Sequence, residues 1–246
     1  MLNFLSTFGP YDYALIVIVT LQATAVSYLH HPRLKALIFM LPIPFTFTAL
    51  AVGKPIGTDN IAGFFLFLLY MFLTLTLHTR FRLPIIPVIL ISAITYTLIG
   101  ALIRPFIPQG TLYIVIFLLA AALIAILILR QMPLRQEPGQ RTNLPIYLKL
   151  PILAAIIITL LCIKSLLGGF LTLFPIMGMI SAYEARNSLH TLTRHALLFV
   201  LLFVPTLATI LLTQPHLPLP AALLTGWATY LTLLSIMLIR NRHRNN

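Results

Sequence analysis

The feature that most constrains this chain is a succession of long apolar runs separated by short turn segments. A run that crosses the hydrocarbon of a bilayer, about 30 Å thick, needs roughly 17 to 25 residues. Nine such runs can be drawn, at approximately 12–29, 34–52, 60–78, 84–103, 112–130, 146–163, 166–183, 196–212 and 220–239. A backbone in lipid must satisfy its hydrogen bonds internally, which helices do. The sequence therefore predicts an all-α membrane protein with nine transmembrane helices, called spans 1 to 9.

The composition excludes a soluble globular domain. Hydrophobic residues make up 60% of the chain and charged residues 8%, whereas soluble domains carry about 25% charged residues. The formal net charge is +12, but the basic residues lie between apolar runs and are expected to encode topology, with no nucleic acid as partner. We expect a multi-pass protein of the cell (inner) membrane, whose partners are the lipid bilayer and a small solute or ion. A homodimer or a partner in a membrane complex stays open.

The distribution of lysine and arginine predicts the orientation. If the N-terminus is outside, only three basic residues fall in outer segments, namely Lys54, Arg104 and Lys164. The other thirteen then fall in inner segments: Arg33, Lys35, Arg80, Arg82, Arg130, Arg135, Arg141, Lys149, Arg186, Arg194, Arg240, Arg242 and Arg244. This asymmetry is what the positive-inside rule requires. We therefore predict an outer N-terminus and an inner C-terminus.

Two proline-containing elements look like copies of each other. The segment Phe39-Met-Leu-Pro-Ile-Pro-Phe-Thr-Phe-Thr-Ala49 aligns with Thr172-Leu-Phe-Pro-Ile-Met-Gly-Met-Ile-Ser-Ala182 at an offset of 133 residues. At an offset of 134 residues, Thr95-Tyr96 likewise aligns with Thr229-Tyr230. A nearly constant offset over several elements indicates a duplication.

The duplication predicts an inverted arrangement. Spans 1–4 would form a first four-helix repeat within residues 1–110, and spans 6–9 a second within residues 145–246. Residues 111–144 would supply the spare fifth span and an inner linker. An odd number of crossings between the copies turns the second one upside down. This 4+1+4 plan, with helices interrupted inside the membrane, is a construction used by transporters and channels.

The second copy resembles a known family. The segment Lys164-Ser-Leu-Leu-Gly-Gly-Phe-Leu-Thr-Leu-Phe-Pro-Ile-Met-Gly-Met-Ile-Ser-Ala-Tyr-Glu-Ala-Arg186 is similar to the GlpM-type small four-span membrane proteins. Those carry a glycine-rich start, a Phe-Pro or Leu-Pro in the helix centre, a small-residue stretch and a tyrosine or acid near the end. The resemblance covers about residues 146–239 and implies a four-helix unit. Outside the segment 164–186 it rests on hydropathy alone. The first copy has Lys35-Ala36 in place of Gly168-Gly169, so an asymmetric site is expected.

The overall plan also resembles that of fused fluoride channels, in which a four-span unit is joined through one extra helix to an inverted copy. That likeness is one of architecture only. Those channels have Gly-Thr, a following asparagine and a Thr/Phe-rich break in the third span. This order is not reproduced, because Gly57-Thr58-Asp59-Asn60 opens span 3 while Gly169-Phe170-Leu-Thr172 lies in span 7.

The prolines near the middle of spans 2 and 7 define a candidate site. A proline removes one backbone hydrogen bond of a helix and frees a carbonyl, which can bind a substrate or an ion. The alternative is a kink that a neighbouring helix or a hydroxyl repairs. The candidate substrate-binding residues of these spans are Pro42, Thr46, Thr48, Thr172, Pro175 and Ser181.

Polar residues of other spans extend the candidate site. Glu184, at the inner end of span 7, is either a proton-coupling or cation-binding carboxylate or an interfacial side chain paired with Arg186 or Arg194. Neutral polar groups inside the bundle include the remaining candidates Gln22, Thr95, Trp227 and Thr229. Their alternative role is helix packing.

The function predicted from this pattern is a secondary transporter or exporter of a small solute or ion. Two alternatives stay open: a passive ion channel of the fused dual-topology type, and a non-transporting subunit of a larger membrane complex. The sequence has no glycine-rich phosphate loop, His-Glu-x-x-His motif or Gly-x-Ser-x-Gly motif, and membrane-embedded enzymes need a constellation of that kind. We therefore expect no enzyme activity, no cofactor and no metal.

Overall fold

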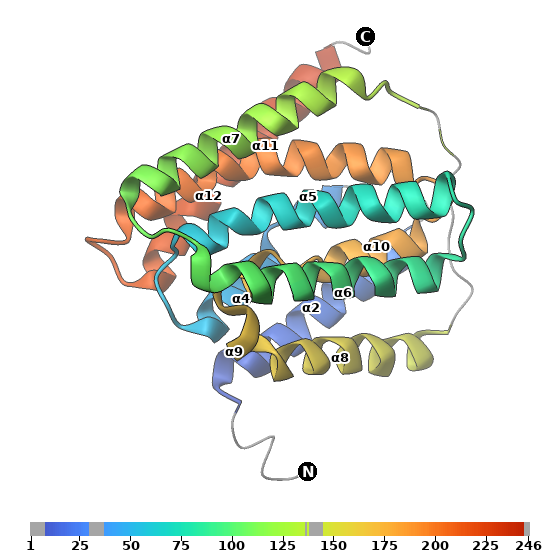
Figure 1. Cartoon of the computed structure of the whole chain (residues 1–246), viewed down its shortest axis with the longest axis horizontal. Helices are drawn as coiled ribbons and strands as arrows, with labels where there is room; N and C mark the ends of the chain where they lie inside the picture. The colour runs from blue at the N-terminus through green and yellow to red at the C-terminus, as the bar shows by residue number, and fades with distance from the viewer. Residues whose placement is uncertain (1–7, 30–36, 136, 138–144, 244–246) are drawn as a thin grey trace.

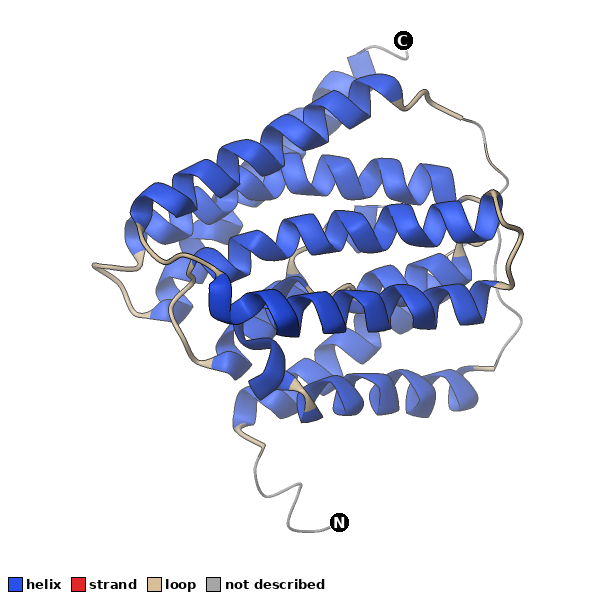
Figure 2. Ribbon diagram, in the orientation of Figure 1, coloured by secondary structure: helices blue, strands red, loops and turns tan. Residues whose placement is uncertain are grey.

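The computed structural model describes residues 8–29, 37–135, 137 and 145–243 of the chain. Helices make up 83% of the structure, and the described ranges contain no strand. Figure 2 shows helices joined by short loops. The predicted all-α fold is therefore confirmed, whereas the nine crossings stay a prediction.

The helices of the first half follow the predicted runs closely. They are α2 (Pro10–Tyr28), a turn of helix at 37–40, α4 (Ile43–Val52), α5 (Thr58–Thr79) and α6 (Ile85–Ile103). A short 3-10 helix, η1 (Arg104–Phe106), extends α6. The run assigned to span 2 is thus interrupted at 41–42, which we call the first break.

The second half contains a corresponding interruption. Its helices are α7 (Thr111–Gln131), α8 (Ile146–Cys162), α9 (Lys164–Leu167), the 3-10 helix η2 (Gly168–Leu173), α10 (Ile176–Glu184), α11 (Leu189–Thr213) and α12 (Leu219–His243). The run assigned to span 7 therefore consists of α9, η2 and α10, interrupted at 174–175. We call this interruption the second break.

Five helices are long and apolar enough to cross a membrane, and they support an integral membrane protein. They are α5, α6 with η1, α7, α11 and α12. The helix α8 and the segment 164–173 pass the same test together, but they are bent by 54° where they meet. The helix α2 is less apolar, because polar side chains such as Thr20 and Gln22 interrupt it.

Successive helices run back and forth, so that the connections gather at two ends of the bundle (Figure 1). At one end, Ile56 of the α4–α5 connection and Gln214 after α11 exchange two hydrogen bonds of 3.0 Å. At the opposite end, the Thr191 amide donates to the Glu137 carboxylate at 2.7 Å. The first end, where Lys164 also lies, is called the predicted outer end below, and the second the predicted inner end.

The helix α11 begins seven residues earlier than its apolar run suggests, at Leu189 instead of about 196. The added turns contain polar side chains such as His190, Arg194 and His195. The length of an apolar run underestimates the length of a helix whose first turns extend beyond the hydrocarbon. Glu137 offsets the helix dipole at this start by accepting the Thr191 N–H group.

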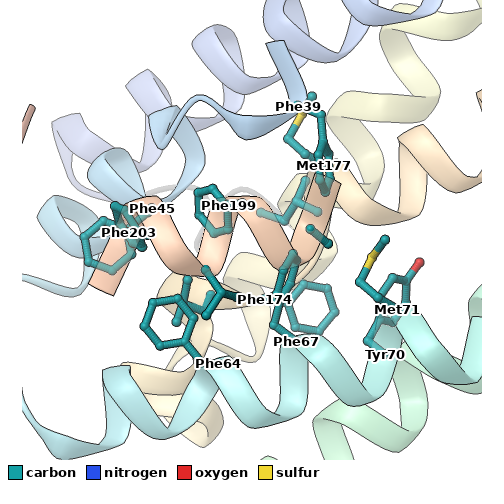
Figure 3. Close-up of a cluster of buried hydrophobic side chains, with 14 of the residues drawn as sticks. Phe39, Phe45, Phe64, Phe67, Tyr70, Met71, Phe174, Met177, Phe199 and Phe203 are labelled. Atoms are coloured by element: carbon teal, nitrogen blue, oxygen red, sulfur yellow. The ribbon is translucent and has the colours of Figure 1, made fainter. Parts of the chain in front are cut away.

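An aromatic cluster fills the interior between α4, α5 and α11 (Figure 3). The ring centroid of Phe203 lies 4.7 Å from that of Phe45 and 4.9 Å from that of Phe199. The ring of Phe64 packs edge-on against Phe203 at 6.0 Å. Such aromatic pairs contribute about 0.5–1.5 kcal/mol each beyond the area that they bury. This cluster therefore holds both halves of the chain together.

Candidate functional site

The two breaks have the same local backbone conformation. Pro42 and Pro175 are the N-cap residues of α4 and α10, with φ and ψ of −78° and 32° for Pro42 and −77° and 50° for Pro175. Each proline carbonyl accepts the N–H group four residues later, from Thr46 at 3.0 Å and from Met179 at 2.8 Å. Proline suits a helix start because its missing N–H group would have no helical partner there. The aligned prolines therefore begin half-helices in the same way.

Side chains from other helices bond the two carbonyls that lose their usual helical N–H partner at the first break; one of them, that of Ile38, also accepts the Leu41 N–H group at 3.2 Å. Proline at 42 and 44 removes the N–H groups that would bond the carbonyls of Ile38 and Met40. The Gln22 amide of α2 donates to the Ile38 carbonyl at 3.0 Å. The Tyr230 hydroxyl of α12 donates to the Met40 carbonyl. At both carbonyls, the structure therefore shows the repair that the sequence left as an alternative.

A second tyrosine makes the corresponding contact near the second break. The Tyr96 hydroxyl of α6 donates to the Phe170 carbonyl of η2 at 2.7 Å. Tyr96 and Tyr230 are 1% and 0% exposed, so water cannot replace either bond. The two tyrosines occupy aligned positions, and each reaches the broken helix of the other half of the chain. Their aligned positions indicated the repeat, but neither tyrosine was among the predicted site residues.

Two predicted site residues meet at the first break. The Trp227 ring N–H of α12 donates to the Thr46 hydroxyl at 2.8 Å. That hydroxyl donates in turn to the Pro42 carbonyl at 2.9 Å. Gln22, Pro42, Thr46 and Trp227 therefore form one group that fixes the start of α4.

Other predicted residues lie apart from this group. The Thr95 hydroxyl donates to the Ile91 carbonyl of its own helix at 2.8 Å. The Thr229 hydroxyl contacts the Thr209 hydroxyl of α11 at 3.2 Å. Thr172, in η2, accepts a hydrogen bond from the Asn60 amide at 3.1 Å. These three residues join helices or satisfy their own backbone.

Three further predicted residues are buried along the half-helices that follow the breaks. Thr48 lies on α4 and is 1% exposed, while Ser181 and Glu184 lie on α10 and are each 3% exposed. Within the described residues, the hydroxyls of Thr48 and Ser181 have no hydrogen-bond partner. A buried hydroxyl without a partner is costly, which makes both positions candidates for contact with a ligand.

The predicted outer end carries charged contacts that the sequence did not reveal. The Gly169 amide donates to the Asp59 carboxylate at 2.9 Å. The Arg104 guanidinium donates to the Ser165 carbonyl at 2.6 Å. The acid and the base are far from these partners in sequence, so no local spacing pattern could have predicted either contact.

The described residues contain no group of three histidine, cysteine, aspartate or glutamate side chains close enough to hold a metal ion. Comparisons with protein-family models, curated proteins and solved structures found no match to this chain. The resemblance to the GlpM-type proteins therefore stays a prediction, and function has to be argued from the fold and its breaks.

Proposed function

We propose that this protein is a secondary transporter or exporter of a small solute or ion in the cell (inner) membrane. The observation that supports the proposal most directly is the pair of half-helices α4 and α10, each of which begins at a proline inside the bundle. The break that precedes α4 also lies next to the segment that leads to the second break, because α4 packs on η2. Carriers use such broken helices because their ends present backbone dipoles to a bound solute.

Packing between the halves supports an inverted repeat as the scaffold of this carrier. Two pairs of helices at corresponding places in the two halves contact each other, namely α2 with α8 and α5 with α11. Contacts between equivalent elements are expected around a twofold axis. The reciprocal bonds of Tyr96 and Tyr230 follow the same relation. Residues 1–110 and 145–246 would then be the two copies, joined through 111–144, and the second would be the GlpM-like unit.

Three neutral polar groups have no partner among the described residues: the buried hydroxyls of Thr48 and Ser181 on the half-helices, and the side-chain oxygen of Gln22 on α2. Glu184, also buried on α10, adds one carboxyl group. Neutral oxygens compensate the desolvation of a neutral solute or a monovalent ion better than that of a multivalent ion. The proposed cargo is therefore a small solute or ion of low charge.

The aromatic cluster favours a second candidate function. Phe45, Phe199 and Phe203 fill the interior beside the first break, and they would have to repack before a solute could pass. Packing of this kind also suits a non-transporting subunit of a membrane complex. The cluster argues against an open channel in this conformation.

A thermal-shift screen followed by counterflow distinguishes these functions. The purified protein is screened against ions and small metabolites, because a ligand that binds the native state raises its melting temperature. A ligand found in this way is then tested for counterflow in proteoliposomes. A carrier gives saturable counterflow and a channel gives rapid, weakly saturable flux. A subunit gives neither, and that result would refute the proposal.

A matched pair of variants tests the position of the site. Thr48→Val removes a hydroxyl that has no partner among the described residues, so it should leave the melting temperature of the free protein unchanged or slightly higher. The same change should reduce the melting-temperature shift caused by the ligand. Thr95→Val is the control, because the Thr95 hydroxyl bonds only its own helix. Equal ligand shifts in both variants would exclude Thr48 from the site.

A further inference from the structure

The segment 164–173, called the strap below, is attached at the predicted outer end by an ion pair to α2. The Lys164 ammonium donates to both carboxylate oxygens of Asp12, at 2.8 and 2.9 Å. Asp12 is 2% exposed, while Lys164 is 30% exposed. One partner of this pair is thus buried and the other is in contact with solvent.

A second charged side chain holds the first turn of the strap. The guanidinium of Arg104, which follows α6, donates to the carbonyls of Ser165 at 2.6 Å and Leu166 at 3.0 Å. These carbonyls lie in α9, a four-residue helix whose last carbonyls lack partners within the helix. Arg104 therefore caps this helix with a positive charge, as its dipole favours.

The start of α5 holds the middle of the strap. The Asp59 carboxylate accepts the Gly169 amide at 2.9 Å, and the Asn60 amide donates to the Gly169 carbonyl at 3.3 Å. A side chain on Gly168 would lie 2.6 Å from the Arg104 guanidinium, and one on Gly169 would overlap the Asp59 carboxylate. The two glycines are therefore required by charged side chains that approach the backbone from α5 and α6.

The strap lies between the predicted outer end and the second break. It continues directly into 174–175, and the side chains of Phe170, Leu171 and Leu173 are at most 4% exposed. The backbone of Gly168 has a φ of +53°, and α8 meets the strap at a bend of 54°. The bend after α8 and the interruption at 174–175 mark the two ends of the strap, where the chain can change direction as hinges require.

We propose that the strap is the outer gate of this carrier and that the structure holds it closed through Asp12, Asp59 and Arg104. This proposal rests on the proposed transport function. Release would move the Lys164 ammonium into water, which that side chain already contacts, and would leave the buried Asp12 carboxylate without its ion-pair partner. Losing the partner of a buried charge is costly, so the closed strap is the resting state. Release would allow the strap to swing about its two hinges, with loss of the Tyr96–Phe170 bond, and would expose the second break to the outside.

Cysteine labelling tests the gate without a known solute. The native Cys162, the only cysteine of the chain, is replaced by serine, and Leu171→Cys places a thiol at a position that is 1% exposed. A membrane-impermeant maleimide is added to right-side-out and to inside-out membrane vesicles. Lys164→Gln or Arg104→Gln should raise the labelling rate in right-side-out vesicles by about tenfold, the factor expected when a charge-assisted hydrogen bond is lost. The exchanged pair Asp12→Lys with Lys164→Asp should restore slow labelling.

Hydrogen exchange on the same variants separates a gate from a structural anchor. A gate predicts faster amide exchange within 164–173 and unchanged exchange in α11 and α12. Unchanged labelling from both sides, labelling that rises only in inside-out vesicles, or faster exchange throughout the protein would each overturn the gate. Neither measurement needs transport, so a gate that opens in a protein without counterflow would refute the proposed function alone. Counterflow without a mobile strap would refute the gate alone.

Discussion

Replacing Tyr230 with phenylalanine removes one hydroxyl from the first break and little else. The ring of Tyr230 stays in its place against Phe203, with ring centroids 6.2 Å apart. The lost hydroxyl donates to the Met40 carbonyl, and position 44 is a proline that cannot offer the usual helical N–H group. Tyr230→Phe therefore leaves a buried acceptor without a partner.

The magnitude follows from the burial of both partners. Tyr230 is 0% exposed and Met40 is 1% exposed, so water cannot take the place of the hydroxyl. An unsatisfied buried acceptor costs about 1–3 kcal/mol in soluble proteins, and hydrogen bonds between membrane helices contribute about 0.6 kcal/mol on average with a maximum near 1.7. We expect Tyr230→Phe to lower the free energy of unfolding by about 1–2 kcal/mol, because full burial places this bond in the upper part of the membrane range.

Equilibrium unfolding in mixed micelles measures this cost. Trp227 is the only tryptophan of the chain and lies one helical turn from Tyr230, so its fluorescence reports the unfolding of this region. Tyr96→Phe should cost a similar amount, since Tyr96 caps the strap carbonyl of Phe170. Tyr113→Phe is the control, because Tyr113 is 40% exposed. A Tyr230→Phe protein as stable as the Tyr113→Phe protein would refute the repair of the first break.

Three further substitutions test other close contacts, each by the same unfolding measurement. Gly169→Ala should destabilise the protein by about 2 kcal/mol or more, because the new methyl group overlaps the Asp59 carboxylate; a neutral effect would show that the strap is not seated as described. Gly226→Ala places a methyl group 2.5 Å from Ile210, so Ile210→Ala should reduce the cost of Gly226→Ala in the double variant; strict additivity would contradict this contact. Gln22→Leu should cost less than Tyr230→Phe, about 0.6 kcal/mol, because the Ile38 carbonyl keeps the Leu41 N–H group as a partner; a cost as large as that of Tyr230→Phe would contradict this second partner.

The sequence predicted the helices and the two interruptions well, because both depend on local properties. Apolar length determines where helices form, and proline determines where a helix cannot continue. The starts of α4 and α10 at Ile43 and Ile176, each directly after a proline, could therefore be derived from the sequence. The early start of α11 at Leu189 could not, since its first turns are polar.

The partners across the bundle could not be derived in the same way. Gln22 was expected to line a binding site, but its amide is used on the Ile38 carbonyl. Gly168-Gly169 was expected only as the glycine-rich start of a span, whereas its close neighbours are the charged ends of Arg104 and Asp59. A sequence shows which groups are costly to bury, but only the packing of distant elements shows which group compensates them. The signal that was available is the pair Tyr96 and Tyr230, whose aligned positions indicated equivalent roles.

The reciprocal tyrosines also restrict how this protein can move. Tyr96 belongs to the first half but holds the strap side of the second break, while Tyr230 belongs to the second half and holds the first break. Two halves that rocked as separate rigid bodies would break both bonds and leave two buried carbonyls without partners, at a cost of about 1–3 kcal/mol each. A motion that keeps both bonds must instead carry α6 with η2 and α12 with the helical turn at 37–40. In a carrier built on this fold, each moving unit is therefore expected to contain the fourth helix of the other repeat. The helix α6 would move with the second half of the chain, and α12 with the first.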